Sequence, residues 1–224
     1  MNQNNARVKI IVYGDYCSGK TNFCMRFAEE KYNPDTRGTF VIDTFFKNII
    51  VDGKDIKTII NDTGNHDISF RTVIEYSKFC EIFFFVYDIT NKSSFQNVRQ
   101  YLYAIQDRKT EKCVVYTLVG TKLDLENERQ VETEEAKKFA DEENLLFIEV
   151  SAKDNINVDE AFTNAISKWL KTKDENNQVE NTENNENENK NENENKYEQY
   201  GSVDAFKIDF DDESNEIELD DIVD

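Results

Sequence analysis

The sequence predicts an α/β protein with a six-stranded, mostly parallel sheet that carries helices on both faces. Two observations predict this class. Short apolar runs typical of strands alternate along the chain with amphipathic stretches of helical period. The run Ile82–Tyr87 is continuously apolar, as expected of a central strand that is covered on both sides.

The expected elements follow from these runs in chain order. Strands are predicted at 7–13, 44–51, 54–61, 82–88, 113–119 and 145–150, and helices at 20–30, 67–78, 92–107, 133–143 and 157–171. Asp52-Gly53 separates the second strand run from the third, and this dipeptide favours a tight hairpin. The second strand should therefore be antiparallel to the third. A ligand of such a sheet binds beyond the carboxyl ends of the parallel strands.

The first strand run leads into the phosphate-binding loop pattern G-x-x-x-x-G-K-[ST], and a helical pattern opens at Lys20. Gly14 and Gly19 should let the backbone wrap around phosphates with its N–H groups pointing inward. Lys20 would reach the β- and γ-phosphates, and the Thr21 hydroxyl would bind Mg²⁺. The residues expected to contact a nucleotide here are Gly14, Asp15, Tyr16, Cys17, Ser18, Gly19, Lys20, Thr21 and Asn22.

Two later loops indicate that the base is guanine. Asp124 comes shortly after a buried strand run, where its carboxylate can accept hydrogen bonds from N1–H and the exocyclic amine of guanine. Adenine lacks this pair of donors, so it would leave the charge unpaired. Lys122 would lie along the base and tie this loop to the phosphate loop. The expected base contacts are Thr121, Lys122, Asp124, Ser151, Ala152 and Lys153, with a backbone N–H of the last three facing guanine O6.

The ordered set of these motifs resembles the small GTPases of the Ras superfamily over residues 7–171. The set comprises residues 14–21, Thr39, Asp62-Thr63-Gly64, Thr121-Lys122-Leu123-Asp124 and Ser151-Ala152-Lys153. The segments at 87–90, 94–98 and 150–153 resemble the Rab branch in particular. Thr121 stands where most relatives carry Asn, a variant seen in the Rho branch, but there is no room after Asp124 for the extra helix of that branch.

The resemblance implies a P-loop NTPase fold and a molecular switch that binds GTP, GDP and Mg²⁺ and hydrolyses GTP. Thr39 lies 18 residues after Thr21 and 23 before Asp62, which is the family spacing of the switch I threonine. The three residues Thr21, Thr39 and Asp62 would hold the metal. Tyr32 falls where the family places an aromatic ring on guanine. Effectors and an exchange factor would read residues 36–46 and 66–76.

Three residues depart from the family pattern at the place of hydrolysis. Asn65 and His66 stand where relatives carry Gly and the Gln that orients the attacking water, and Tyr16 stands where relatives carry a small residue. Asn tolerates positive φ, so Asn65 could still present its N–H to the γ-phosphate. An imidazole differs in shape from an amide, and the Tyr16 ring would crowd the water. We expect hydrolysis to be slow, with His66, Thr39 and Lys20 as the residues of the reaction.

Most of the net negative charge of the chain lies in its last 51 residues. The formal charge is −19, and residues 174–224 hold 19 acidic residues against three lysines, a net charge of −16. Such Asn/Glu-rich sequence buries too little apolar surface to offset the entropy of ordering. We therefore expect a GTPase domain at 1–173 and a disordered tail at 174–224. The alternation in Ala205–Phe210 suggests a segment that docks onto a protein, and a solubilising extension is the open alternative.

The four cysteines lack metal-ligand spacing, which favours free thiols in a reducing cytoplasm. No signal peptide or apolar stretch long enough to span a bilayer is visible. No cysteine follows Cys113, so we expect no direct lipid anchor and recruitment to membranes through protein partners only. We also expect a monomer and no nucleic-acid partner.

Two further functions stay open beside the hydrolysing switch. One is a non-hydrolysing, GTP-bound scaffold that recruits partners through its switch face and acidic tail, and Tyr16 and His66 favour it. The other is a different P-loop enzyme, such as a nucleoside kinase, and Asp124 together with Ser151-Ala152-Lys153 argues against it.

Overall fold

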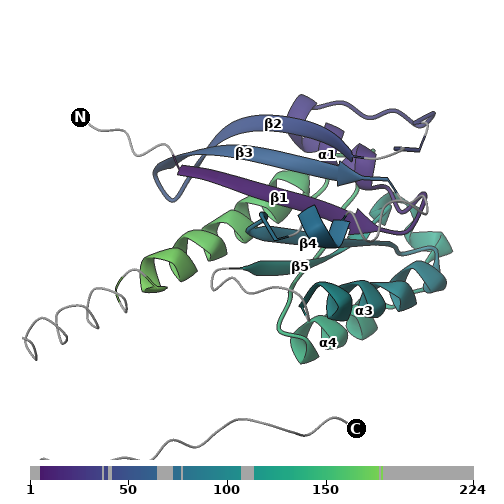
Figure 1. The fold of residues 1–224 in the computed structure, drawn as a ribbon. Coiled ribbons are helices and arrows are strands. Elements are labelled where there is room, and N and C mark those ends of the chain that lie inside the picture. Colours follow the sequence, from purple (N-terminus) through teal and green to yellow (C-terminus); the bar gives the residue numbers. More distant parts are fainter. Residues whose placement is uncertain are drawn as a thin grey trace, which may run out of the picture. The chain divides into compact units, whose positions relative to one another are not determined.

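A computed structural model of the chain shows a six-stranded sheet with helices on both faces (Figure 1), which confirms the predicted fold class. The structure describes residues 6–36, 38–39, 42–64, 73–76, 78–106, 114–176 and 178. The strands are β1 (Ala6–Gly14), β2 (Ile42–Val51), β3 (Lys54–Thr63), β4 (Ile82–Asp88), β5 (Val115–Thr121) and β6 (Leu146–Glu149). The helices are α1 (Lys20–Glu29), α3 (Lys92–Gln106), the 3₁₀ helix η1 (Leu123–Glu128), α4 (Thr133–Glu142) and a last helix at 158–176.

The strands lie in the order β2-β3-β1-β4-β5-β6. Only the β2–β3 pair is antiparallel within this sheet, as predicted. Its hairpin turns at Asp52 (φ 50°) and Gly53 (φ 73°), and positive φ at both central residues is the geometry that matches the twist of the two strands. The carboxyl ends of β1, β3 and β5 carry the residues of the predicted site.

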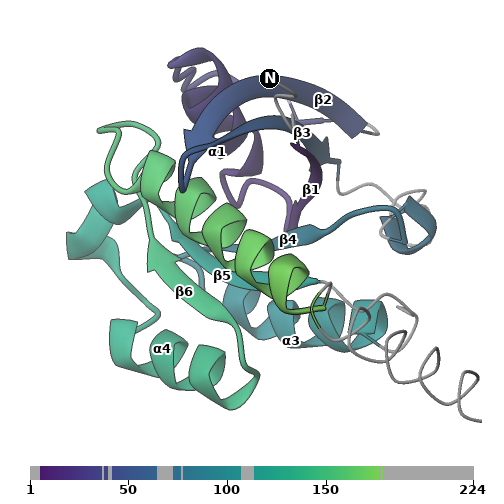
Figure 2. The same ribbon diagram turned by 90° about the vertical axis from the view of Figure 1, so that its left-hand side faces the viewer.

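Helices cover both faces of the sheet (Figures 1 and 2), and two apolar layers hold them to it. On one face, α1 and the last helix pack against alternate residues of β1 and β4, with Phe162 stacked on Phe27 at 3.8 Å between ring centroids. On the other face, α3 and α4 pack through Phe95 and Phe139. All seven residues of β4 are buried, because this strand lies in the middle of the sheet and both of its faces are covered.

The observed elements differ from the predicted ones mainly at their ends. The last helix continues to residue 176, five residues beyond its predicted end, and Asp174 on its final turn pairs with Lys54 at 2.9 Å. The sequence did not predict η1, which follows β5 directly. The helix predicted at 67–78 lies largely outside the described residues. Within this range the structure describes residues 73–76 and 78, and residues 73–76 are helical. The tail from 179 onward also lies outside them, so the boundary after Lys173 stays a prediction.

Candidate nucleotide site

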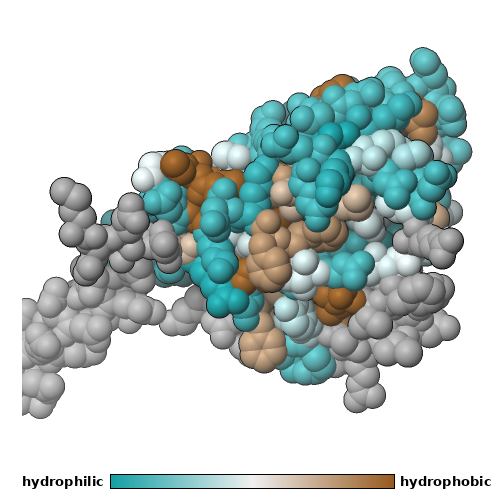
Figure 3. Space-filling model, turned by 90° about the horizontal axis from the view of Figure 1, so that it is seen from above, coloured by the Kyte–Doolittle hydropathy of each residue, from teal (hydrophilic) through white to brown (hydrophobic). Residues whose placement is uncertain are grey.

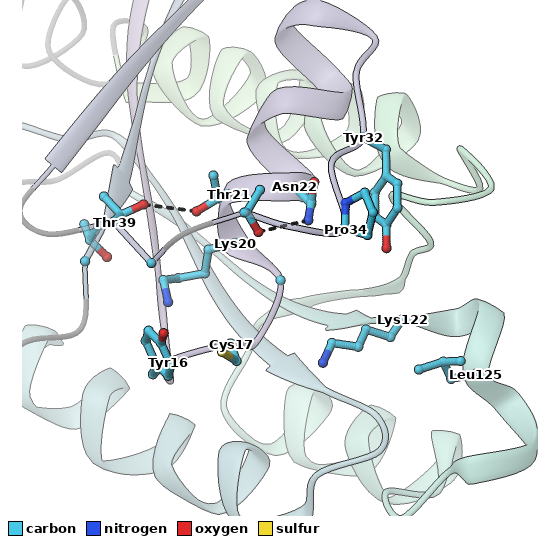
Figure 4. Close-up of a pocket in the computed structure, with 15 residues that line it drawn as sticks. Tyr16, Cys17, Lys20, Thr21, Asn22, Tyr32, Pro34, Thr39, Lys122 and Leu125 are labelled. Atoms are coloured by element: carbon cyan, nitrogen blue, oxygen red, sulfur yellow. Dashed lines mark hydrogen bonds between the residues drawn. The ribbon is translucent and has the colours of Figure 1, made fainter.

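A cavity of about 360 Å³ opens at the carboxyl ends of β1 and β3. Four segments line it (Figure 4): the phosphate loop with the start of α1, residues 32–36 and 38–39, the end of β3 at Thr63 and Gly64, and the segment after β5. Tyr32 and Pro34 lie on one side of the cavity and Tyr16 and Thr39 on the other. The predicted residues in its lining are Tyr16, Cys17, Gly19, Lys20, Thr21, Asn22, Tyr32, Thr39 and Lys122.

The phosphate loop has the backbone shape that an anion needs. Cys17 (φ 60°) and Gly19 (φ 89°) both adopt left-handed conformations. Left-handed residues in such a turn allow successive backbone N–H groups to point into one concavity, where an anion can bind. The Lys20 ammonium spans this loop, donating to the carbonyl oxygens of Gly14 at 2.9 Å and Asp15 at 2.7 Å. Burial lowers the pKa of Lys20, and the nearby Asp62 and Asp15 carboxylates oppose this shift. A phosphate would provide the negative charge that such a buried ammonium favours.

A steric requirement at Gly14 adds to the role predicted for it. A Cβ at this position would lie 2.0 Å from the carbonyl oxygen of Val86. Gly14 is therefore required because β1 and β4 approach each other closely at the base of the loop. Gly19, by contrast, is required for its positive φ, since a side chain there would strain the backbone.

The three predicted metal ligands converge on one point. The hydroxyls of Thr21 and Thr39 lie 2.6 Å and 2.9 Å from the same Asp62 oxygen, Oδ2, and 3.1 Å from each other. Among the described residues, the other oxygen of the buried Asp62 carboxylate has no partner. Burial also raises the pKa of Asp62. Clustered oxygen atoms with unmet negative charge suit Mg²⁺, so Thr21, Thr39 and Asp62 fit the metal.

The predicted base loops also meet. Ser151 Oγ donates to Asp124 Oδ1 at 2.7 Å, and Lys153 Nζ lies 3.7 Å from Asp124 Oδ2. Lys122 Nζ is 2.6 Å from Asp88 Oδ2. The link to the phosphate loop comes from the neighbouring residue, because the Thr121 hydroxyl lies 2.6 Å from the carbonyl oxygen of Ser18.

Several residues that position the site were not predicted. Asn97 and Tyr101 of α3 donate to the Asp15 carboxylate at 2.8 Å and 2.6 Å, so Asp15 anchors the phosphate loop to α3. Arg26 Nε donates to the Ala152 carbonyl oxygen at 2.7 Å and fixes the second base loop to α1. These contacts join residues 82 to 126 positions apart, so no local pattern could have shown them.

The remaining predictions concern Asn22, Tyr32 and the loop after β3. The Asn22 side chain holds the start of the 32–39 segment, since it accepts from the backbone N–H of Asn33 at 2.9 Å and donates to its carbonyl oxygen at 3.0 Å. Tyr32 is 37% exposed and lines the cavity. Asn65 and His66 lie outside the described residues.

This arrangement combines an anion-binding loop, an oxygen cluster for Mg²⁺ and a carboxylate that matches guanine, which together define a guanine-nucleotide-binding P-loop protein. The sequence model of the Ras family matches residues 9–171, and the chain belongs to this family. It is therefore a small GTPase that binds GTP, GDP and Mg²⁺.

Curated relatives point to the Rab branch within this family. The chain is similar to "GTP-binding protein ypt2" of Schizosaccharomyces pombe, with 37% identity over 80% of this chain and 89% of the relative. It is also similar to "GTP-binding protein ypt3" of the same organism (38% identity, 73% and 76%) and to "Ras-related protein Rab-2B" of Dictyostelium discoideum (36%, 79% and 87%). The predicted Rab-like resemblance is confirmed.

Proposed function

We propose that this small GTPase is a Rab-type switch of vesicle trafficking or signalling that hydrolyses GTP more slowly than its relatives. The observation that carries the proposal is the position of Tyr16. Its side chain lines the cavity, as do Thr39 and Gly64, and it lies on the same side of the cavity as Lys20 and Thr39 (Figure 4). Phosphoryl transfer depends on positioning a water in this region, so a ring that occupies it slows the reaction.

The remaining residues take the roles that the family resemblance gives them. Lys20 would neutralise charge on the phosphates, and Thr39 would hold Mg²⁺ through its hydroxyl. His66 would replace the glutamine that orients water. A neutral imidazole has one donor and one acceptor in a shape unlike that of an amide, which also favours slow hydrolysis.

Small GTPases of this family bind effectors and exchange factors, and we propose that here residues 36–46 and 66–76 contact them. Within the first range, Phe46 is 60% exposed on β2, whereas Phe45 packs into the core. The view from above shows scattered apolar side chains on an otherwise hydrophilic surface (Figure 3). Phe46 therefore offers an apolar contact that the sheet does not use.

We further propose that the protein is a cytoplasmic monomer that protein partners recruit to membranes. Support comes from the tail, because its net charge of −16 would be repelled by an anionic leaflet. No helix among the described residues is long and apolar enough to cross a bilayer. A tail segment that docks onto a partner belongs to the same proposal.

Single-turnover hydrolysis of GTP by the full chain tests the rate. Small GTPases of the Ras type turn over at roughly 10⁻⁴ s⁻¹ without an activator, and we expect a lower value here. Tyr16→Gly combined with His66→Gln should restore the rate. Tyr103→Phe, on the exposed face of α3, is the matched control. If the double variant and the unaltered chain hydrolyse GTP at the same rate, Tyr16 and His66 do not limit the reaction.

The second candidate is a GTP-bound scaffold that does not hydrolyse its nucleotide, and the same position of Tyr16 favours it. The nucleotide released on denaturing the purified protein separates the two functions. GDP indicates a working switch, whereas GTP indicates a scaffold.

A further inference from the structure

Tyr16 of the phosphate loop contacts Gly38, which immediately precedes the metal ligand Thr39. A Cβ built on Gly38 would lie 2.5 Å from Cε2 of the Tyr16 ring, 3.3 Å from its hydroxyl oxygen and 3.4 Å from Cζ. The ring therefore lies against the bare backbone of Gly38. No other residue type fits at position 38 unless the ring moves away, since real Cβ atoms do not approach other atoms to 2.5 Å.

The contact joins the two walls of the cavity. Tyr16 belongs to the phosphate loop, which Lys20 and Asp15 hold through buried and partly buried hydrogen bonds. Gly38 belongs to the segment between α1 and β2. The side chain of Tyr16 is 55% exposed, so the core does not fix its position, and Gly38 forms one of its supports.

We propose that Tyr16 and Gly38 form a latch that holds Gly38 and Thr39 against the phosphate loop, closed over the nucleotide, and slows its release. Thr39 is the next residue, and its hydroxyl lies 2.9 Å from Asp62 Oδ2. Holding Gly38 against the phosphate loop therefore also holds Thr39 at the metal site. Tyr16 acts here as a positioning residue.

The latch rests on the proposed function only in taking this cavity as the nucleotide site. Its effect concerns the dissociation of nucleotide, and it does not require that hydrolysis be slow. A guanine nucleotide enclosed by the phosphate loop can leave only when the segment that covers it lifts. Because the latch joins the segment to the loop directly, it resists this opening whether or not a γ-phosphate is present.

The release of a fluorescent GDP analogue from the full chain, in excess unlabelled GTP and saturating Mg²⁺, tests the latch. Tyr16→Ala removes the ring, and Gly38→Ser adds a Cβ that forces the ring away. Each single change should speed release roughly five- to tenfold, which corresponds to losing one modest contact. In the chain that carries Tyr16→Ala, the further change Gly38→Ser should alter release less than twofold, because no ring remains to displace.

Tyr103→Ala is the matched control, since it removes an exposed tyrosine from α3 on a different part of the surface. A release rate of Tyr16→Ala within twofold of the unaltered chain overturns the latch. Equal effects of Gly38→Ser with and without Tyr16 overturn it as well, since the two residues would then act independently. Slow hydrolysis is measured separately with GTP, so either idea can fail while the other stands. Failure of the unaltered chain to bind the analogue overturns both.

Discussion

Replacing Asp124 with Asn tests the assignment of guanine most directly. The Asp124 side chain is 11% exposed, and its Oδ1 already accepts a hydrogen bond from Ser151 Oγ at 2.7 Å. A guanine base would bring two further donors, N1–H and the exocyclic amine, to this carboxylate. In Asp124→Asn, an amide NH₂ group would face at least one of these donors without an acceptor between them.

The expected loss follows from the charge of the acceptor. A hydrogen bond to a charged group contributes about 1.5–3 kcal/mol, so two of them contribute about 3–6 kcal/mol. This corresponds to a loss of GDP affinity of roughly 10²- to 10⁴-fold. Xanthine carries a carbonyl oxygen in place of the exocyclic amine. The variant should therefore favour xanthine nucleotides over guanine nucleotides.

Equilibrium displacement of a fluorescent GDP analogue by GDP, XDP and ADP measures the three affinities. Glu126→Gln is the matched control, because it also removes a carboxylate from η1, and its exposed side chain pairs with Arg129 instead of with the Ser151–Lys153 loop. The reasoning is refuted if Asp124→Asn lowers GDP affinity less than tenfold, or if ADP displaces the analogue from the unaltered chain as well as GDP does.

Four further outcomes are expected. Arg129→Ala should lower the free energy of unfolding by about 3–5 kcal/mol in chemical denaturation, because it strips the partner from the nearly buried Glu149 carboxylate. Asn61→Ala should lower it by about 2–4 kcal/mol in the same assay, since the buried Asn61 amide links three elements. Chelating Mg²⁺ should speed GDP release at least tenfold in the fluorescence assay, because the Asp62 carboxylate would then repel the phosphates. Burial raises the pKa of Tyr116 to about 12, so the stability that its neutral hydroxyl contributes should be present below pH 10 and lost as pH rises towards 12, which a denaturation series against pH would show.

Each of these outcomes has a control. Lys138→Ala breaks an exposed pair with Glu142 at 3.8 Å and should change stability by less than about 0.5 kcal/mol, so a loss equal to that of Arg129→Ala would mean that burial of the pair is unimportant. Tyr116→Phe should reduce the loss of stability between pH 10 and 12, and an unchanged loss would point to another group. In the chelation experiment, adding Mg²⁺ back should restore slow GDP release, which would exclude damage to the protein by the chelator. Thr44→Val removes one of the Asn61 contacts and should cost less than Asn61→Ala does.

The parts of the fold that the sequence predicted are those set by short-range patterns. The continuous apolar run of β4 and the Asp52-Gly53 turn each determine one element through neighbouring residues. The 3₁₀ helix η1 escaped prediction because its six residues carry no periodic apolar face, and none of them is buried. The last helix runs five residues past its predicted end into polar sequence, where Asp174 pairs with Lys54 across 120 positions.

The site, too, divides into features set by local sequence motifs and features set by contacts between distant elements. Sequence motifs indicated the residues that would touch the nucleotide, and the structure brings Thr21, Thr39 and Asp62 to one point. The residues that hold those groups in place were missed, because an anchor such as Tyr101 on Asp15 depends on how two elements pack. The steric reason for Gly14 was missed as well, since it depends on the contact with Val86 across the sheet.

At two positions that depart from the family pattern, Thr121 and Tyr16, neighbouring residues accommodate the unusual side chain. Thr121 stands where relatives carry Asn, yet its short hydroxyl still reaches the Ser18 carbonyl oxygen at 2.6 Å, so the base loop stays tied to the phosphate loop. Tyr16 is the departure that adds a ring to the phosphate loop, and the missing side chain of Gly38 provides the room. The ring at position 16 therefore requires a glycine in the segment that faces it. A change at Gly38 should therefore displace the Tyr16 ring, and a smaller residue at position 16 should remove this effect.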